Sequence, residues 1–265
     1  FWIDEEGNFW RATVFIDNSF APSAFSDARE ASLVAKSFGR FTLELAGLNS
    51  EELDIIIADF HNLSFRYNQF EAAINKAAIQ RLLKSTHVIA ELRQRKFLVD
   101  FFEKIKEDEN YKLRVMHHDC KISNILFDKT TKQVICPVDL DTTMPGYYFS
   151  DLGDMIRSMA CTVDENSTMW EKIDVESKYY DAIVNGYMET MSNEFTDEER
   201  KHIHHSGLLL IYMQALRFVT DFLNNDIYYK TTYPEQNLNR ALNQLILLEK
   251  LEEFLVREYE YNLTA

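Results

Sequence analysis

The sequence predicts an α+β protein that is mostly α-helical, and three observations support this prediction. Short apolar runs typical of strands occur at the beginning of the chain and again between residues 114 and 139, and long segments with apolar residues at helical spacing fill the rest. Strands and helices do not alternate, so a parallel sheet built from βαβ units is not expected. Hydrophobic residues make up 46% of the 265 residues and aromatic residues 13%, which is enough for a substantial core.

The first 50 residues predict a hairpin followed by a helix. Apolar stretches on either side of an acidic, glycine-containing turn give residues 1–16 the pattern of a hairpin whose second strand runs to the end of that range. Ser26 or Asp27 can cap a helix that continues to about Leu45, because the apolar residues that follow share one helical face. Gly47 is expected to end this helix.

Helical patterns dominate the remainder of the chain. Thr196 and Pro234 are start signals for the last two helices. The segment 87–107 shows this helical pattern through its apolar positions Ile89, Leu92, Phe97, Leu98, Phe101, Phe102 and Ile105. The helices expected after the first are 64–84, 87–107, 173–192, 196–223 and 235–260.

Residues 114–139 interrupt this pattern and predict a loop followed by a β-hairpin. Residues 125–127 and 134–138 are short apolar runs, and the polar residues 129–132 between them form the turn. The hairpin therefore carries acidic residues at both of its ends.

The loop before this hairpin has the spacing that phosphoryl transfer requires. Residues 117–124 read H-x-D-x-K-x-x-N, and the distance from Asp to Asn equals that of the kinase catalytic loop. Asp119 would orient the attacking hydroxyl and act as the base, with Lys121 beside the transferring phosphate as a compact positive charge. Asn124 and Asp139, at the two ends of the hairpin, would supply oxygen ligands for magnesium.

Several neighbouring residues are interpreted as structural. His117 is expected to brace the backbone around Asp119, and His118 to be a spacer at the substrate rim. Asp151 and Asp154 are expected to cap the next helix and to hold the catalytic loop through hydrogen bonds. Cys120 is expected to fill space in the loop rather than act as a nucleophile.

Two further features of the sequence allow more than one interpretation. Arg217 lies inside an apolar helix, where a charge must be paired or must face a cleft, so it predicts either an internal ion pair or a contact to a substrate. His202, His204 and His205 do not have the spacing of a zinc site, and solvated helix residues are the expected outcome.

Bulk composition excludes some classes of partner. The net charge of −15 argues against nucleic-acid binding and against docking to an anionic membrane. No apolar run reaches the 18 residues typical of a transmembrane helix, and the N-terminus has no signal-peptide pattern. Three cysteines without a CxxC pair indicate neither a disulfide framework nor a zinc site, so a cytoplasmic location is expected.

With these residues in view, the chain resembles the aminoglycoside phosphotransferase and choline kinase-like superfamily, and within it the N-acetylhexosamine 1-kinases. The resemblance spans essentially the whole chain, and the stretch 139–157 is the part typical of sugar 1-kinases. The segments that carry the resemblance are 7–11, 39–41, 57–62, 117–128, 138–146, 151–157 and 217–228.

The resemblance implies a protein kinase-like fold. Residues 1–23 would be a remnant of the N-terminal lobe sheet with the hinge between lobes, and residues 24–265 the helical C-terminal lobe, with the catalytic loop and its hairpin at 114–141.

The resemblance also implies an activity, which is ATP- and Mg²⁺-dependent phosphorylation of the anomeric hydroxyl of N-acetylglucosamine or N-acetylgalactosamine in amino-sugar salvage. Its partners would then be a sugar and a nucleotide. Arg217 and Tyr228 would contact the sugar together with Asp119, and Asp141 would assist with metal or sugar. The residues whose backbone would bind adenine are Phe15, Ile16 and Asp17.

The chain departs from the resembled family at its beginning, where the phosphate-covering loop and the Lys–Glu pair of an upper lobe have no counterpart. The chain alone is therefore expected to have little or no kinase activity. Two alternatives stay open: a kinase of the same superfamily acting on an aminoglycoside, choline or another sugar, and a catalytically inactive sugar-binding domain.

Overall fold

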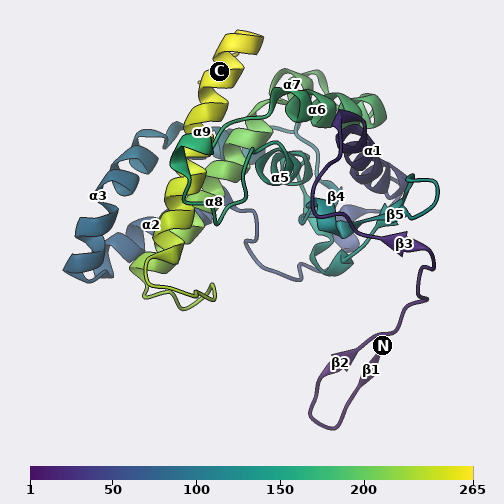
Figure 1. The fold of residues 1–265 in the computed structure, drawn as a ribbon, viewed down its shortest axis with the longest axis horizontal. Coiled ribbons are helices and arrows are strands. Elements are labelled where there is room, and N and C mark those ends of the chain that lie inside the picture. The colour runs from purple at the N-terminus through teal and green to yellow at the C-terminus, as the bar shows by residue number, and fades with distance from the viewer. Residues whose placement is uncertain (265) are drawn as a thin grey trace.

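Helices dominate the computed structural model, which describes residues 1–264 and so confirms the mostly helical α+β class (Figure 1). The α-helices are α1 (Ala28–Glu44), α2 (Leu63–Lys76), α3 (Ile79–Gln94), α4 (Phe97–Glu107), α5 (Phe149–Met159), α6 (Ser177–Met191), α7 (Asp197–Lys201), α8 (His205–Leu223) and α9 (Gln236–Tyr259). Short 3₁₀ turns are η1 (Ser50–Glu52), η2 (Ile122–Asn124), η3 (Leu140–Thr142) and η4 (Trp170–Lys172). The strands are β1 (Trp2–Ile3), β2 (Phe9–Trp10), β3 (Ser19–Phe20), β4 (Arg114–Met116), β5 (Ile125–Asp128), β6 (Val134–Pro137) and β7 (Met144–Gly146).

Helix α8 is the centre of the core. It packs against α9, α5, α2 and α3, while α1 and α6 pack together on the far side of α5 (Figure 1). By length and composition α8 could also cross a membrane, but 83% of its most apolar window is buried inside the protein. A helix that is apolar on all sides because other helices surround it is a core helix.

The strands form small antiparallel sheets that frame residues 114–146. Strands β5 and β6 make the expected hairpin, with Ile125 opposite Pro137, and β3 adds to its edge. Strands β4 and β7 pair so that Arg114 lies opposite Gly146. The chain from residue 114 to 146 is therefore tied together at its two ends.

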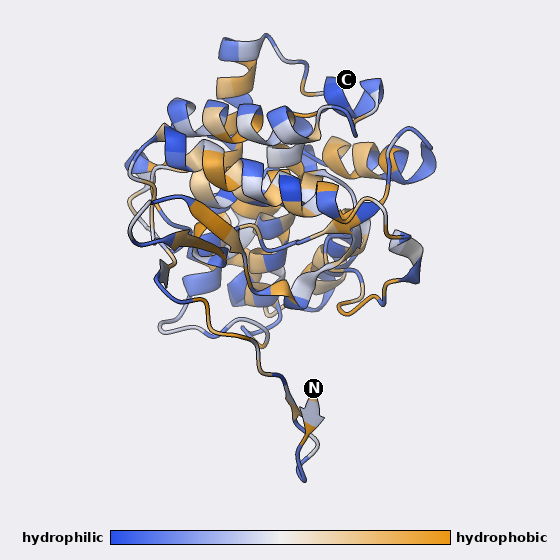
Figure 2. Cartoon of the chain, turned by 90° about the vertical axis from the view of Figure 1, so that its right-hand side faces the viewer, coloured by the Kyte–Doolittle hydropathy of each residue, from blue (hydrophilic) through white to orange (hydrophobic). Residues whose placement is uncertain are grey.

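The N-terminal hairpin is shorter than the sequence predicts. Strand β2 ends at Trp10 instead of residue 16, and residues 11–16 form no strand. Figure 2 shows this segment projecting from the body of the molecule, and Phe15 on it is 80% exposed. This segment contains residues that favour strands, but no strand among the described residues pairs with it. An extended segment without a partner strand is not stabilised.

Three of the expected long helices are interrupted. The segments predicted at 64–84 and 87–107 form three helices, with extended backbone at Ala77 and Ala78. The segment 196–223 divides into α7 and α8 at residues 202–204. At Ala77 and Ala78, packing of α2 on α8 and of α3 on α8 and α9 overrides local propensity. The helix starts predicted at Asp27 and Thr196 are confirmed. Asp27 caps α1 by accepting a hydrogen bond from the amide of Glu30. Thr196 makes a capping box with Glu199.

Gly47 does not end α1 as expected. The helix stops at Glu44, the cap residue Leu45 has a φ of −95°, and Gly47 lies in the turn that follows. The left-handed conformation that favours glycine at a helix end is not used there.

The three histidines expected to be solvated are packed inside the protein, so that prediction was wrong. His202 and His205 are 4% and 1% exposed. Each histidine contacts a tyrosine hydroxyl: His202 that of Tyr111, His204 that of Tyr180 and His205 that of Tyr261. The fold turns the short α7–α8 connection inward, which sequence spacing alone does not indicate.

Burial of these histidines predicts acid sensitivity. Burial lowers the pKa of His204 and of His205 to about 4. The unfolded chain, whose histidines titrate near 6.5, then binds protons between pH 6.5 and 4 that the folded chain does not bind. The free energy of unfolding should therefore fall as the pH falls through this window, by about 2 kcal/mol at pH 5 from His205 alone. Urea unfolding at pH 7 and pH 5 should show the loss, and His205→Gln should reduce it. Equal pH dependence in both proteins would contradict this explanation.

Candidate active site

Asp151, in the first turn of α5, holds the backbone of the predicted catalytic loop. Its carboxylate accepts hydrogen bonds from the amides of His117, at 3.0 Å, and His118, at 2.8 Å. His118 has a φ of 67°, a left-handed conformation that costs energy for a residue with a side chain. The two buried charge-assisted hydrogen bonds offset this cost, so the expected loop-holding role of Asp151 is confirmed.

His117 braces the same loop, as predicted. The ring is fully buried, with its edge against Phe38, and its Nδ1 accepts from the amide of Asp119 at 3.3 Å. Its Nε2 therefore carries the proton and donates to the carbonyl of Val138 at 3.0 Å. This bond joins the catalytic loop to the residue before Asp139.

His118 and Cys120 flank Asp119 without the chemistry of a nucleophile. His118 is buried, with its Nε2 3.2 Å from the carbonyl of Met144 and its Nδ1 3.3 Å from Nδ1 of His61. Burial is the largest cause lowering the pKa of His118. Cys120 is fully buried, and burial raises the pKa of its thiol well above the ordinary value. A buried, protonated thiol is inert, which agrees with the space-filling role expected for Cys120.

Asp119, Lys121 and Asn124 come together as the motif predicts. Oδ2 of Asp119 accepts from Nζ of Lys121 and from Nδ2 of Asn124, each at 2.8 Å. Burial acts to lower the pKa of Lys121, but the hydrogen bond and charge of Asp119 outweigh it and raise the pKa. Within residues 1–264, Oδ1 of Asp119 has no protein donor, so this oxygen can accept a proton from a ligand.

Asp139 lies beside this group on the other side of the hairpin. The amide of Val138 donates to the carbonyl of Asn124 at 2.8 Å, which joins the two ends of the hairpin. Asp139 itself has a φ of 62° and an exposed carboxylate whose charge acts on Lys121. Asn124 uses its amide nitrogen on Asp119, so its amide oxygen is the side-chain atom left to act as a ligand. Two oxygen donors of this kind fit Mg²⁺, which usually takes only one or two protein carboxylates or amides beside phosphate and water.

Asp141 lies two residues farther along, within η3, and is exposed. It forms an ion pair with Arg11, so its carboxylate would have to leave that guanidinium to reach a cation. Among the described residues, no group of three or more His, Cys, Asp or Glu side chains is arranged to hold a metal without further ligands.

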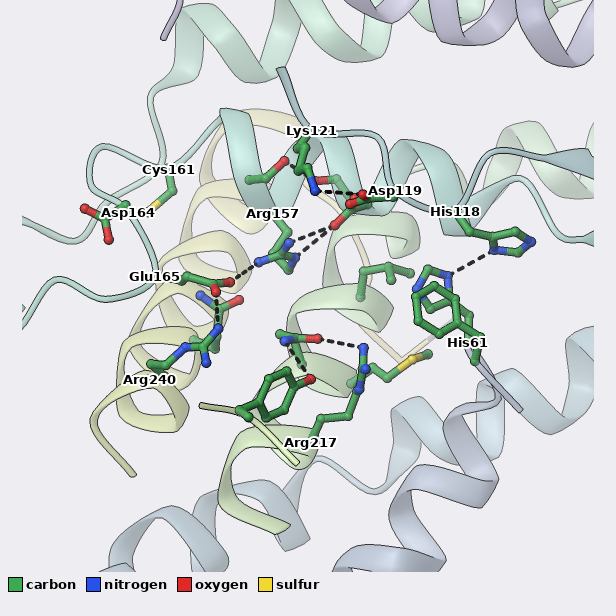
Figure 3. A pocket seen from close by; sticks show the side chains of 18 of the residues that line it. His61, His118, Asp119, Lys121, Arg157, Cys161, Asp164, Glu165, Arg217 and Arg240 are labelled. Atoms are coloured by element: carbon green, nitrogen blue, oxygen red, sulfur yellow. Dashed lines mark hydrogen bonds and ion pairs between the residues drawn. The ribbon is translucent and has the colours of Figure 1, made fainter. Parts of the chain in front are cut away.

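A cavity of about 410 Å³ opens in front of Asp119. Figure 3 shows Asp119 and Lys121 on one side of it and Arg217 on the opposite side. The catalytic loop, the segment before α2, the segment after α5, and helices α5, α8 and α9 all contribute side chains. Those used below are Phe60, Asp119, Lys121, Asp154, Arg157, Asp164, Glu165, Gln214, Arg217, Tyr229 and Arg240.

A chain of ion pairs lines the third side of the cavity (Figure 3). Arg157 pairs with Asp154 at 2.9 Å and with Glu165 at 2.8 Å, and Glu165 also pairs with Arg240. Burial alone would lower the pKa of Arg157, but these carboxylates raise it. Burial raises the pKa of Asp154. The pairing with Arg157 supports a structural role for Asp154, although Asp154 caps no helix.

Sequence reasoning missed Glu165 and Arg240 entirely. They come from the segment after α5 and from α9, 75 residues apart, and no motif joins them. Only the tertiary structure shows that these two charged side chains are buried next to each other, where each needs an oppositely charged partner.

Arg217 faces the cavity, and the ion-pair alternative for it is wrong. Its guanidinium carbon lies 5.4 Å from the ring centroid of Phe60, 5.9 Å from that of Tyr228 and 5.7 Å from that of Tyr229. Its one hydrogen bond within residues 1–264 goes to the amide oxygen of Gln214 at 3.2 Å. No described carboxylate pairs with it.

Tyr229, rather than the predicted Tyr228, lines this cavity. Asp221 accepts from the amides of both tyrosines, at 2.8 and 2.9 Å, and so turns the chain just after α8. The turn places Tyr228 at a smaller neighbouring cavity with its ring 69% exposed. Sequence spacing indicates that an aromatic residue returns to Arg217, but not which of the two does.

Phe15, Ile16 and Asp17 lie apart from this cavity. The carbonyl of Ile16 accepts from the hydroxyl of Ser19 at 2.6 Å, and the carbonyl of Asn18 accepts from the amide of Lys129 at 2.7 Å. Strand β3 thus ties the predicted adenine-binding segment to the edge of the catalytic hairpin.

A comparison with protein-family models matches residues 5–174 to the phosphotransferase enzyme family, abbreviated APH. The matched range covers more than half of the chain and contains the catalytic loop, the hairpin, Asp139 and the start of the ion-pair chain. Arg217, Tyr229 and Arg240 lie outside it. The match therefore includes the side of the cavity that carries Asp119 and Lys121. It does not include the opposite wall, which carries Arg217 and Tyr229.

Proposed function

The chain belongs to the phosphotransferase enzyme family, which supports a small-molecule phosphotransferase, and from this premise we propose that it phosphorylates the anomeric (C1) hydroxyl of an N-acetylhexosamine with ATP as donor. The observation that carries the proposal is the arrangement of the main cavity. Asp119 faces it with one unoccupied carboxylate oxygen, and Arg217 faces it from the opposite wall without a carboxylate partner.

Asp119 would act as the base. Lys121 and Asn124 hold its Oδ2, which leaves Oδ1 to accept a hydrogen bond and then the proton of the acceptor hydroxyl. Lys121 keeps a positive charge next to the position of the transferring phosphoryl group. The rigid loop held by Asp151 and His117 keeps Asp119 in place, and positioning supplies much of the rate in this kind of reaction.

The donor side of the site would lie on the hairpin. The amide oxygen of Asn124 and the carboxylate of Asp139 would hold Mg²⁺, which would neutralise charge on the donor phosphates. The backbone of Phe15, Ile16 and Asp17 would bind adenine. In this proposal residues 1–23 contribute the adenine side, and residues 24–265 contribute the phosphoryl and acceptor sides. A cytoplasmic enzyme of this kind suits the three free cysteines.

The charge balance of the cavity favours a neutral acceptor. The four cationic side chains that line it, Lys121, Arg157, Arg217 and Arg240, are matched by four carboxylates. Three of those carboxylates already have cationic partners within the protein. A guanidinium among aromatic rings suits the hydroxyl and amide oxygens of an N-acetylated sugar and disfavours the ammonium groups of aminoglycosides or choline.

Calorimetric titration tests the acceptor class. N-acetylglucosamine and N-acetylgalactosamine should bind saturably, and Arg217→Gln should weaken binding at least about tenfold because a charged hydrogen-bond donor is lost. Arg257→Gln is the matched control, since Arg257 is an exposed arginine of α9 whose ion pair is with Glu258, and it should leave binding unchanged.

Glucose and kanamycin are titrated as control ligands in the same experiment. Binding of kanamycin in place of the N-acetylhexosamines would replace the proposal with an aminoglycoside acceptor. Binding of glucose as tight as that of the N-acetyl sugars would remove the role given to the amide. Absence of binding by all four ligands would overturn the proposed sugar acceptor.

A further inference from the structure

A second, smaller cavity of about 190 Å³ lies behind Arg217. Arg217 and Tyr229 line both cavities, so they form the partition between them. Helix α2 contributes Arg66 to the smaller cavity, and α8 contributes Thr220 and Asp221. The role proposed above for the main cavity does not use Arg66 or Thr220.

Two arginines meet in this small cavity without a counter-charge. Arg66 donates to the carbonyl of Phe60 at 3.2 Å and to the amide oxygen of Gln69 at 2.9 Å, which are both neutral acceptors. Arg217 donates to the neutral amide of Gln214. Burial, and next the positive charge of Arg217, lower the pKa of Arg66, and the negative charge of Asp59 only partly opposes this.

The other half-buried arginines of the protein are paired with carboxylates. Each of them has at least one carboxylate within ion-pair distance, as expected for groups whose burial must be compensated. These are Arg81, Arg95, Arg114, Arg157 and Arg240.

The carboxylate that lines the small cavity does not neutralise the two arginines. Oδ1 of Asp221 accepts from the amide of Tyr228, and Oδ2 accepts from the amide of Tyr229 and from the side chain of Asn237 at 2.9 Å. Asp59 is exposed, and one of its oxygens accepts from Asn62 at 2.7 Å. Within the described residues neither carboxylate pairs with Arg66 or Arg217.

Two residues that line the cavity also carry a buried donor with no acceptor in the described part of the protein. These donors are Nε of Arg66 and the hydroxyl Oγ1 of Thr220. Unsatisfied buried donors are rare in folded proteins, and each such group needs an explanation. A ligand with several acceptor oxygens between α2 and α8 would satisfy both of them and the charge of the two guanidinium groups.

We infer that the small cavity is a binding site for an oxyanion, that is a carboxylate, sulfate or phosphate group, held by Arg66, Arg217 and Thr220. Paired guanidinium groups match the geometry of such groups. The oxyanion has two sources, which share this chemistry. It is either a free anion or a substituent of a ligand that extends from the main cavity past Arg217. The second source rests on the function proposed above, and the first does not.

Titration with sodium sulfate, at ionic strength kept constant with sodium chloride, tests the site itself. Saturable binding is expected, and Arg66→Gln should weaken it at least about tenfold, as loss of a charge-assisted contact implies. Thr220→Val keeps the shape of the side chain and removes its hydroxyl, so it should weaken binding severalfold. Arg257→Gln should not change it. Arg66→Gln should leave the binding of neutral N-acetylglucosamine intact, so the two proposals can fail separately.

Comparison of N-acetylglucosamine with its 6-sulfate and 6-phosphate distinguishes the sources. Tighter binding of an anionic sugar than of the neutral one, abolished by Arg66→Gln, assigns the site to a substituent. Sulfate binding that is indifferent to added N-acetylglucosamine assigns it to a free anion. The inference is overturned if sulfate does not bind saturably and neither anionic sugar binds more tightly than the neutral one. Sulfate binding that Arg66→Gln leaves unchanged would overturn it equally, because the anion would then lie elsewhere.

Discussion

In a form of the protein with measurable kinase activity, replacement of Asp119 by asparagine is expected to lower kcat about 1,000-fold, while the affinity for the acceptor changes little. Asparagine has the same shape but cannot accept the proton of the acceptor hydroxyl. The change also removes the charge that pairs with Lys121 at 2.8 Å. Steady-state kinetics should therefore show a loss in kcat, and calorimetry should show a dissociation constant close to that of the unchanged protein.

Asp164→Asn is the matched control for this experiment. Asp164 lines the same cavity, but it is exposed and lies in the segment after α5, away from the catalytic loop. Its loss should change kcat by less than about tenfold, since no charge-assisted contact to Asp119, Lys121 or Asn124 is removed. Turnover by Asp119→Asn within tenfold of the unchanged protein would refute the role of Asp119 as the base.

Replacement of Gly153 by alanine is expected to destabilise the fold by about 3 kcal/mol or more. Gly153 lies where α5 crosses α8, and a Cβ there would be 2.3 Å from the carbonyl oxygen of Ser206 and 2.9 Å from the side chain of Leu210. The obstacle is partly backbone, which cannot rotate away, so the two helices must move apart. Urea unfolding should show the loss as a lower midpoint with an unchanged slope.

The same change should also disturb the site, because α5 carries Asp151 and Asp154 on either side of Gly153. Gly47→Ala is the control: a Cβ at Gly47 would meet no atom within 4 Å, so its effect should stay within about 0.5 kcal/mol. Similar stabilities for Gly153→Ala and Gly47→Ala would show that α5 and α8 can separate without cost, contrary to the close packing inferred here.

Local features of the fold could be predicted from the sequence because their causes are local. Asp27 and Thr196 cap helices through amides three residues away, and the hairpin of β5 and β6 follows from two apolar runs around a polar turn. The breaks inside the expected helices could not be predicted in this way. Extended backbone at Ala77 and Ala78 lets α2 and α3 each pack on α8, and nothing in the local sequence marks that need.

For the site, the sequence by itself determined the group of Asp119, Lys121 and Asn124. These residues lie within five positions of one another in the same loop, so their side chains can reach hydrogen-bonding distance without contacts from elsewhere in the chain. Only the tertiary structure decided what faces them. The pairing of Glu165 with Arg240, the choice of Tyr229 over Tyr228 and the meeting of Arg66 with Arg217 join segments that are far apart or turned by long-range contacts. Such contacts depend on how helices cross, and helix crossings depend on the whole core rather than on any one stretch of sequence.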